Sequence, residues 1–237
     1  MSEGECVPVS PRAAGLPSSE VWSSGKIASD PFQYQTVIDQ ICELGWSNLT
    51  RHNLLNVAWA YYFFSVQFRE NLEIACNLYP DDVKLRQLKW EECNTENLSP
   101  WPGVANSGEK INHDEFVRRL LTLSPISVGR RRGLEAIGRR YLTTVRQIDV
   151  VVRASSIASY EDGGLGRVFQ AILACKYWDN PSLQAFRHFL TAHIRFDDDA
   201  GGGHAALCRH LRLDDQILPL WTAFKSLLIE SVPRLSV

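Results

Sequence analysis

The sequence lacks an excess of charge of either sign. Its 237 residues include 25 Lys and Arg against 27 Asp and Glu, which leaves a formal net charge of -2. Hydrophobic residues make up 45% and charged residues 22%, proportions typical of globular proteins. This balance argues against a collagen-like chain, a wholly disordered chain and a polybasic nucleic-acid-binding protein. We therefore expect no nucleic-acid partner.

Long apolar runs and paired cysteines are also missing. The longest uncharged run, 53–68, is short for a bilayer span and contains Asn56, Ser65 and Gln67. The first twenty residues have neither the basic region nor the apolar core of a secretory signal. The six cysteines are scattered without a CxxC pair, a pattern typical of reduced thiols. These absences predict a cytoplasmic protein with no membrane partner.

Common catalytic motifs are absent as well. The GGLG tract at 163–166 has no third glycine and no Walker lysine, and the chain contains no GxSxG element. The arginines at 130–132 and 139–140 favour a solvated helix face over a nucleic-acid site in so neutral a chain. Phosphate-loop and serine-hydrolase chemistry are therefore not indicated.

Helical periodicity, in contrast, is abundant. Residues 1–28 are rich in Ser, Pro and Gly and predict a disordered or extended arm, followed by one helical domain over 29–237. The segment 49–78 is apolar nearly all round, which is typical of a helix at the centre of a bundle. With alternating strand patterns nearly absent, we predict an all-α bundle of seven to nine helices. Its helices are expected over 36–44, 49–78, 82–94, 113–123, 130–154, 155–176 with an interruption at Gly163-Gly164, 180–199 and 213–232, with helical character resuming at His204.

The segment 188–211 holds the first candidate metal ligands. His193 and Asp197 are four residues apart and share a helix face, about 40° from each other. His204 would lie about 20° from His193 if the helix continued through the glycines at 201–203. Two imidazoles and one carboxylate form a ligand set that suits iron or, less selectively, manganese or zinc.

Further candidates come from other predicted helices. Glu91 and Glu92 follow a tryptophan, and His113 begins the helix after a Pro- and Gly-rich loop at 97–112. Glu161 precedes two glycines and an apolar run. Each residue also has a structural interpretation, as a solvated position or a helix cap. Carboxylates and histidines from several helices are nevertheless how a bundle holds two metal ions.

The order Glu, His, Glu, His-x3-Asp and His in an all-α chain resembles the heme-oxygenase-like diiron oxidase and oxygenase family. This family shares its fold with heme oxygenase, the thiaminase-like TenA proteins and PqqC. The tract WEECNTENLSPWPGV is similar to the chlamydial-CADD-like branch. The sequence departs from the usual His-x3-Asp-x2/3-His pattern, because six residues separate Asp197 from His204. Asp198 and Asp199 are therefore alternatives to Asp197.

The resemblance implies a cofactor, a co-substrate and a ligand set. It implies two iron ions per chain, cycling between Fe(II) and Fe(III), with O2 as co-substrate and an amine or amino-acid-like metabolite as substrate. It also allows an external electron donor and a homodimer. Tyr160 and Arg195 are candidates for binding the substrate. The implied metal ligands are Glu92, His113, Glu161, His193, Asp197 and His204, with Glu91 as an alternative to Glu92.

Two other functions remain open. The first is an enzyme of the same fold without a diiron centre, as in the TenA and PqqC branches, for which Cys93 or Cys208 would be a candidate nucleophile. The second is a non-catalytic helical interaction module that binds through the N-terminal arm and the arginines at 130–140.

Overall fold

The computed structural model describes residues 33–93, 100–197, 203–211 and 214–236, apart from the side chains of Phe196 and Asp197. The predicted arm at 1–28 lies outside these residues. Within them the chain is all-α, as predicted, and its only strand-like feature is an isolated bridge between Trp101 and Ala105. Nine of its α-helices have eight residues or more. They are α1 (Gln33–Cys42), α2 (Arg51–Leu78), α3 (Val83–Cys93), α4 (His113–Leu120), α5 (Val128–Arg146), α6 (Val150–Ser159), α7 (Leu165–Leu173), α8 (Pro181–Asp197) and α10 (Leu218–Ser231), with the short α9 (His204–Cys208) before the last.

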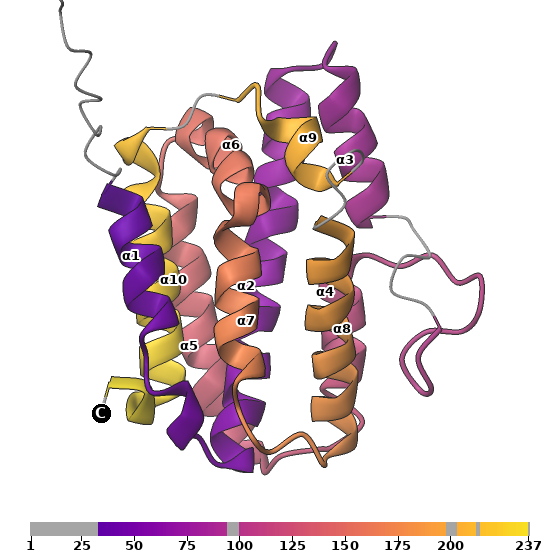
Figure 1. Ribbon diagram of the computed structural model, residues 1–237, viewed down its shortest axis with the longest axis vertical. Helices are drawn as coiled ribbons and strands as arrows, with labels where there is room; N and C mark the ends of the chain where they lie inside the picture. Colours follow the sequence, from indigo (N-terminus) through magenta and orange to yellow (C-terminus); the bar gives the residue numbers. More distant parts are fainter. Residues whose placement is uncertain (1–32, 94–99, 198–202, 212–213, 237) are drawn as a thin grey trace, which may run out of the picture. The chain divides into compact units, whose positions relative to one another are not determined.

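The long helix α2 lies at the centre of the bundle. Its first turn is fixed by a capping box in which Thr50 and Asn53 each accept a hydrogen bond from the other's backbone N–H. Buried residues then occur on every side of the helix, from Leu54 to Ala75. α2 contacts α3, α4, α5, α6, α8 and α10, an arrangement visible in Figure 1. The all-round apolar pattern of 49–78 therefore predicted its central position correctly.

Two groups of helices flank α2. α1, α5 and α10 pack together on one side, and α4 and α8 pack together on the other. α9 contacts α3, α6, α8 and the turn between α6 and α7, so four segments that are distant in sequence meet at one end of the bundle. Large aromatic side chains fill the interior, among them the fully buried Phe64, Phe169, Phe224 and Trp221.

The predicted helix over 130–154 is in fact two helices. α5 ends at Arg146 and α6 begins at Val150. Asp149 caps α6, because its side chain accepts hydrogen bonds from the backbone N–H groups of Val151 and Val152. The apolar stripe through Ile148 and Val152 kept its helical spacing across the break, which is why the periodicity concealed it. A polar residue that caps a helix competes with helix continuation, and here the cap prevails.

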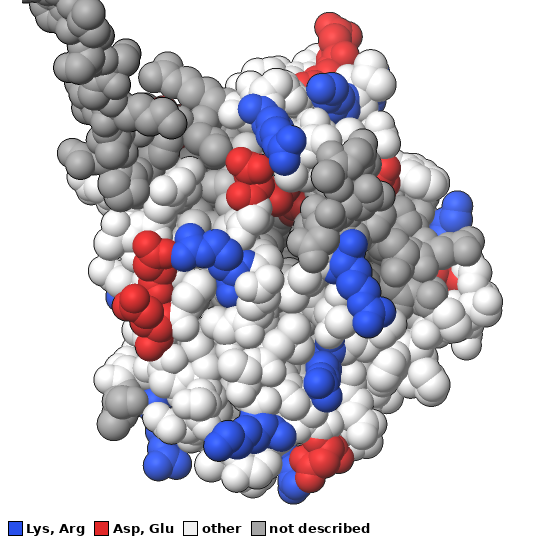
Figure 2. All heavy atoms as spheres, viewed as in Figure 1, with Lys and Arg blue, Asp and Glu red and all other residues white. Residues whose placement is uncertain are grey.

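None of the helices in the described ranges is long and apolar enough to cross a membrane. The five cysteines within those ranges are free thiols. On the face shown in Figure 2, Lys and Arg are interspersed with Asp and Glu, and neither sign of charge forms a continuous surface among the residues drawn in colour.

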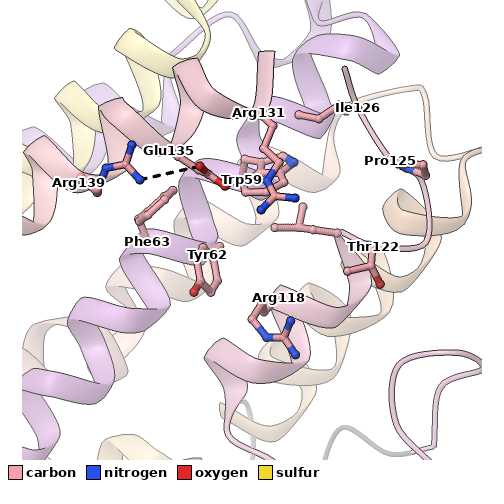
Figure 3. Close-up of a pocket in the computed structure, with 11 residues that line it drawn as sticks. Trp59, Tyr62, Phe63, Arg118, Thr122, Pro125, Ile126, Arg131, Glu135 and Arg139 are labelled. Carbon is pink, nitrogen blue, oxygen red and sulfur yellow. Dashed lines mark hydrogen bonds and ion pairs between the residues drawn. The ribbon is translucent and has the colours of Figure 1, made fainter. Parts of the chain in front are cut away.

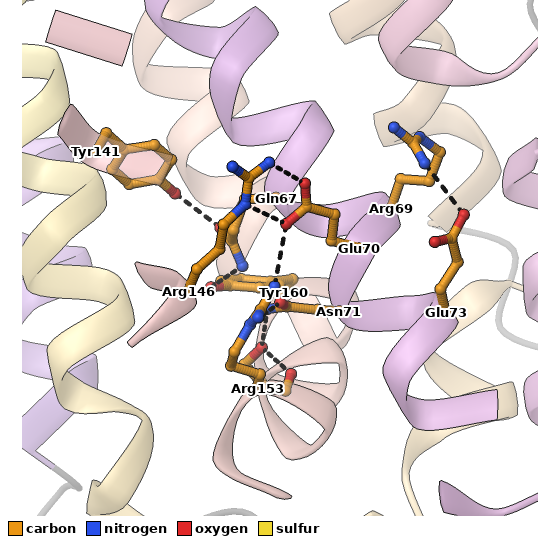
Figure 4. Close-up of polar contacts among 10 residues, drawn as sticks. Gln67, Arg69, Glu70, Asn71, Glu73, Tyr141, Arg146, Arg153 and Tyr160 are labelled. Carbon is orange, nitrogen blue, oxygen red and sulfur yellow. Dashed lines mark hydrogen bonds and ion pairs between the residues drawn. The ribbon is translucent and has the colours of Figure 1, made fainter. Parts of the chain in front are cut away.

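A buried polar network joins α2 to α5 and α6 (Figure 4). Arg153, whose side chain is 7% exposed, donates hydrogen bonds to Asn71 at 2.9 Å and to Glu70 at 3.2 Å. Arg146 donates to the same Glu70 carboxylate at 3.0 Å. Burial alone would raise the pKa of Glu70, but the two guanidinium groups outweigh it and lower that pKa below its ordinary value.

The depressed pKa of Glu70 makes stability depend on pH. A carboxyl group whose pKa is lower in the folded than in the unfolded state stabilises the fold above its unfolded pKa, and this contribution is lost as the pH falls through the folded pKa. We expect Glu70→Gln to lower the free energy of unfolding by about 2 kcal/mol at pH 7, because Arg153 loses a charged partner. Urea denaturation at a series of pH values measures this, and the difference from wild type should shrink as the pH falls below about 4. A difference that stays constant with pH would contradict the assignment.

Candidate metal centre

The first ligand candidate, Glu92, lies near the end of α3. Leu85, Leu88 and Glu92 are buried on one face of this helix, at the spacing of an amphipathic stripe. Asp82 starts the helix by accepting hydrogen bonds from the backbone N–H groups of Lys84 and Leu85. The carboxylate of Glu92 is therefore carried into the protein interior on the apolar face of its helix, where a charge requires partners.

Two histidines approach Glu92 from α4 and α8. His113 is the first residue of α4, and its Nδ1 atom lies 2.5 Å from Glu92 Oε2. His193 follows Phe186, Phe189 and Leu190 on the buried face of α8, and its Nε2 atom lies 3.1 Å from His113 Nδ1. The ligand atoms of Glu92, His113 and His193 all lie within 4.8 Å of one another. We call these three residues the first ligand group.

The geometry of His193 indicates which of its nitrogens faces the group. Its Nδ1 atom lies 2.8 Å from the carbonyl oxygen of Phe189, which can only accept a hydrogen bond. The proton of a neutral ring is therefore on Nδ1, and the lone pair is on Nε2, directed toward the group. Burial, and next the charge of His113, lower the pKa of His193 to about 3, so the ring is neutral at pH 7. Metal-binding histidines typically donate a hydrogen bond to a backbone carbonyl or a carboxylate from the ring nitrogen that does not bind the metal.

Glu161 occupies a turn that no helical periodicity could place. The segment η2 (Tyr160–Gly164) is a π-helical turn between α6 and α7, and Gly163 within it has a φ of 88°. Gly164 allows a close approach, since a Cβ atom there would lie 2.2 Å from the carbonyl oxygen of Ser159. Turns of this kind are frequent at functional sites. The interruption predicted at Gly163-Gly164 is thus a wide turn, and Glu161 within it is buried.

His204 completes a second ligand group. It is the first residue of α9 and is 1% exposed. Its Nδ1 atom lies 2.9 Å from Glu92 Oε1 and 3.2 Å from Glu161 Oε2. The ligand atoms of Glu92, Glu161 and His204 all lie within 4.8 Å of one another. Glu92 therefore belongs to both groups. Its Oε2 atom faces the first group at His113, and its Oε1 atom faces the second at His204.

The charges of the second group are partly compensated within the group. Burial alone would lower the pKa of His204, but Glu92 and Glu161 outweigh it and raise that pKa to about 11. Burial would likewise raise the pKa of Glu92, yet the imidazoles of His113 and His204 hold it well below its ordinary value. Burial raises the pKa of Glu161, an effect that His204 opposes. One imidazolium thus offsets only one of the two buried carboxylates, and the second requires a further positive charge.

A further observation supports the fit of this donor set to a metal ion. Glu92 Oε1 and His204 Nδ1 are both buried and face each other at 2.9 Å. A buried carboxylate oxygen and an imidazole nitrogen directed at each other are donors that one metal ion could bind. A small cavity of about 20 Å³ is lined by Glu92, His113, Glu161 and His193 among others. That volume accommodates roughly one water molecule or ion.

Of the six predicted ligands, the structure brings together Glu92, His113, Glu161, His193 and His204. Asp197 is the last residue of α8, and its side chain, like Asp198 and Asp199, lies outside the described residues. The condition that one helix continues from His193 to His204 is not met, because Gly203 has an extended backbone and His204 begins a separate helix. Glu91 belongs to neither ligand group, and its Oε2 atom lies 3.4 Å from His204 Nε2.

The two predicted substrate-binding residues lie elsewhere. Tyr160 is buried against the rings of Phe64 and Trp221, and its hydroxyl accepts a hydrogen bond from Gln67 at 3.4 Å. Arg195 is exposed on α8. Neither residue lines the small cavity at the ligand groups.

Arg69 lines this cavity and was missed by the sequence analysis. It donates to Asp114 Oδ2 at 3.0 Å and forms an ion pair with Glu73. The sequence does contain a signal for Arg69, since it is the first charged residue after the uncharged run at 53–68.

Comparison of the chain with models of protein families, with curated proteins and with solved structures found no match.

Proposed function

We propose that the protein is a non-heme diiron oxidase or oxygenase acting on a small amine or amino-acid-like metabolite. The observation that carries the proposal is the sharing of Glu92 between two ligand groups, which is the role of a bridging carboxylate in a two-metal site. Three imidazoles and two carboxylates from α3, α4, α8, α9 and the π-helical turn form a nitrogen and oxygen donor set suited to iron. The resemblance described in the sequence analysis supports iron over manganese or zinc.

The protein's own residues would have three roles in such a site. His113 and His193 would hold one ion and Glu161 and His204 the other, with Glu92 between them. The Phe189 carbonyl would keep the Nε2 atom of His193 free to bind. Bound iron would supply the activation of O2, which amino-acid side chains alone do not perform. The buried aromatic residues around His193, including Phe169 and Phe189, would keep bulk water away from the reacting atoms.

Asp114 supports an amine as the substrate. Its Oδ2 atom accepts a hydrogen bond from Arg69, whereas its Oδ1 atom is buried without a hydrogen-bond partner among the described residues. Both residues line the small cavity beside the ligand groups. With a volume of about 20 Å³, the cavity would have to widen to admit a substrate. An amino group bound there would satisfy Asp114 Oδ1, and a carboxylate would be attracted to Arg69.

A thiol-dependent enzyme of the same fold is less well supported. Burial, and next the nearby Glu92 carboxylate, raise the pKa of Cys93 to about 12, which disfavours the nucleophilic thiolate. Cys208 is fully buried, and its thiol contacts the carbonyl oxygen of His204. The interaction module remains a second alternative, and the metal content of the protein distinguishes it from the diiron enzyme.

Single histidine variants test the two-group arrangement. We expect His193→Ala and His204→Ala each to reduce iron content from about two ions per chain to about one, because each residue belongs to only one group. His188→Ala is the matched control. His188 also lies on α8, but its ring stacks on that of Trp101, with 4.7 Å between the ring centroids. Metal analysis after anaerobic loading with Fe(II) and gel filtration gives the stoichiometry. Retention of both ions in both variants would refute the arrangement.

A further inference from the structure

A second cavity lies between α2, α4 and α5 (Figure 3). Its volume is about 480 Å³, within the range of small-molecule pockets. It shares no lining residue with the small cavity at the candidate metal centre. Any ligand it holds would therefore bind away from the metal ions.

The wall formed by α2 is aromatic. Trp59 and Tyr62 are half-buried and Phe63 is buried, and all three line the cavity. Leu121 and Ile126 add aliphatic surface from the segment that joins α4 to α5. Half-buried aromatic side chains that line a cavity offer apolar area to a ligand at little cost in conformational entropy.

The position of this wall is fixed by a close helix approach. Gly138 of α5 lies against Phe63 so closely that a Cβ atom there would be 2.1 Å from the ring. The ring of Phe63 on α2 therefore packs directly against the backbone of α5 at Gly138. A wall held in this way is formed before a ligand arrives, which reduces the cost of binding.

The rim of the cavity is cationic. Arg118, Arg131 and Arg139 line it, with side chains 53%, 62% and 66% exposed. Glu135, the acidic residue of the lining, binds Arg131 at 2.7 Å and lies 3.8 Å from Arg139, beyond hydrogen-bonding distance. Glu115 binds Arg118 at 2.6 Å. The three guanidinium groups of the rim therefore share two carboxylates, those of Glu135 and Glu115. Figure 3 shows Arg139 on the opposite side of Glu135 from Arg131, with the Arg139–Glu135 ion pair drawn as a dashed line.

We propose that this cavity binds a small organic carboxylate with an aromatic body, held by its ring against Trp59 and Tyr62 and by its carboxylate at the cationic rim of Arg118, Arg131 and Arg139. Arginine binds carboxylates through two parallel hydrogen bonds, and the aromatic wall selects a flat apolar body over a small inorganic anion. The cavity does not depend on the diiron proposal, because it uses none of the candidate ligands.

Calorimetric titration of the full chain with 1-naphthylacetate, and with the uncharged 1-naphthylacetamide, tests the site. We expect the acid to bind at least about tenfold more tightly than the amide, and the variant Arg131→Gln/Arg139→Gln to lose this preference, because hydrogen bonds between two charged groups are stronger than those to a neutral amide. Arg140→Gln is the control, because Arg140 is equally exposed on α5 but binds Glu230 at 2.8 Å. It should bind the acid as wild type does.

Any of four results would overturn the proposal. The first is equal binding of acid and amide by the wild-type protein, and the second is unchanged acid binding in the double variant. The third is no binding of the acid at millimolar concentration. The last is an equal loss of acid binding in Arg140→Gln, because the effect would then come from the overall charge of the protein and not from this cavity. Iron content should be the same in all these variants, so failure here leaves the diiron proposal separately testable.

Discussion

Replacement of Glu92 by glutamine is expected to lower the iron content from about two ions per chain to nearly none. The reason is that Glu92 contributes one oxygen to each ligand group, through Oε2 beside His113 and Oε1 beside His204. No other described residue belongs to both groups. The amide keeps the size of the side chain but removes the negative charge that two adjacent cations require.

The neighbouring variant Glu91→Gln is the matched comparison. Glu91 lies on the same helix, accepts a hydrogen bond from Gln87 at 2.9 Å and belongs to neither ligand group. We expect it to retain about two iron ions per chain under the same anaerobic loading. The opposite pattern, with iron lost in Glu91→Gln and kept in Glu92→Gln, would show that the bridging residue has been misassigned.

Gly164→Ala is expected to cause the largest loss of stability among the glycine variants of the π-helical turn. A Cβ atom at this position would lie 2.2 Å from the carbonyl oxygen of Ser159 and 2.9 Å from the ring of Trp221. Neither neighbour can move freely, because the Trp221 indole also donates a hydrogen bond to the Ser159 hydroxyl at 3.0 Å. We expect a loss of about 3 kcal/mol in the free energy of unfolding.

Gly166→Ala is the control for this variant. Gly166 lies in the first turn of α7, and a Cβ atom there meets nothing within 4 Å. Because alanine favours the helix over glycine, this variant should be more stable than wild type by about 0.5–1 kcal/mol. Chemical denaturation measures both values. Gly164→Ala should also lose iron from the group of Glu161 and His204, since the turn fixes Glu161. Equal stability of the two variants would refute the account of the turn.

Helical periodicity accounts for the burial of two candidate ligands on regular helices, although the sequence singled out Glu92 through the family resemblance. Glu92 shares a helix face with Leu85 and Leu88, and His193 shares one with Phe186 and Phe189, so their burial follows from periodicity. The central position of α2 followed in the same way. These inferences depend only on the 3.6-residue repeat, which the folded chain preserves within each helix.

Other features depend on contacts that periodicity does not encode. The end of α5 at Arg146 is set by the cap at Asp149, and the inward direction of Glu161 is set by the packing of Gly164 against Ser159. His204 joins the site from a separate helix, so its angle relative to His193 could not follow from residue spacing. The cavity beneath Arg139 is formed by three segments that only the tertiary structure brings together.

Anaerobic titration of the wild-type protein with Fe(II), followed by exposure to O2, tests the central claim most directly. The shared position of Glu92 between two ligand groups predicts binding of about two Fe(II) ions per chain and a transient visible absorption band after O2 is added. A folded protein that retains no iron after loading, and develops no absorption with O2, would contradict the diiron assignment.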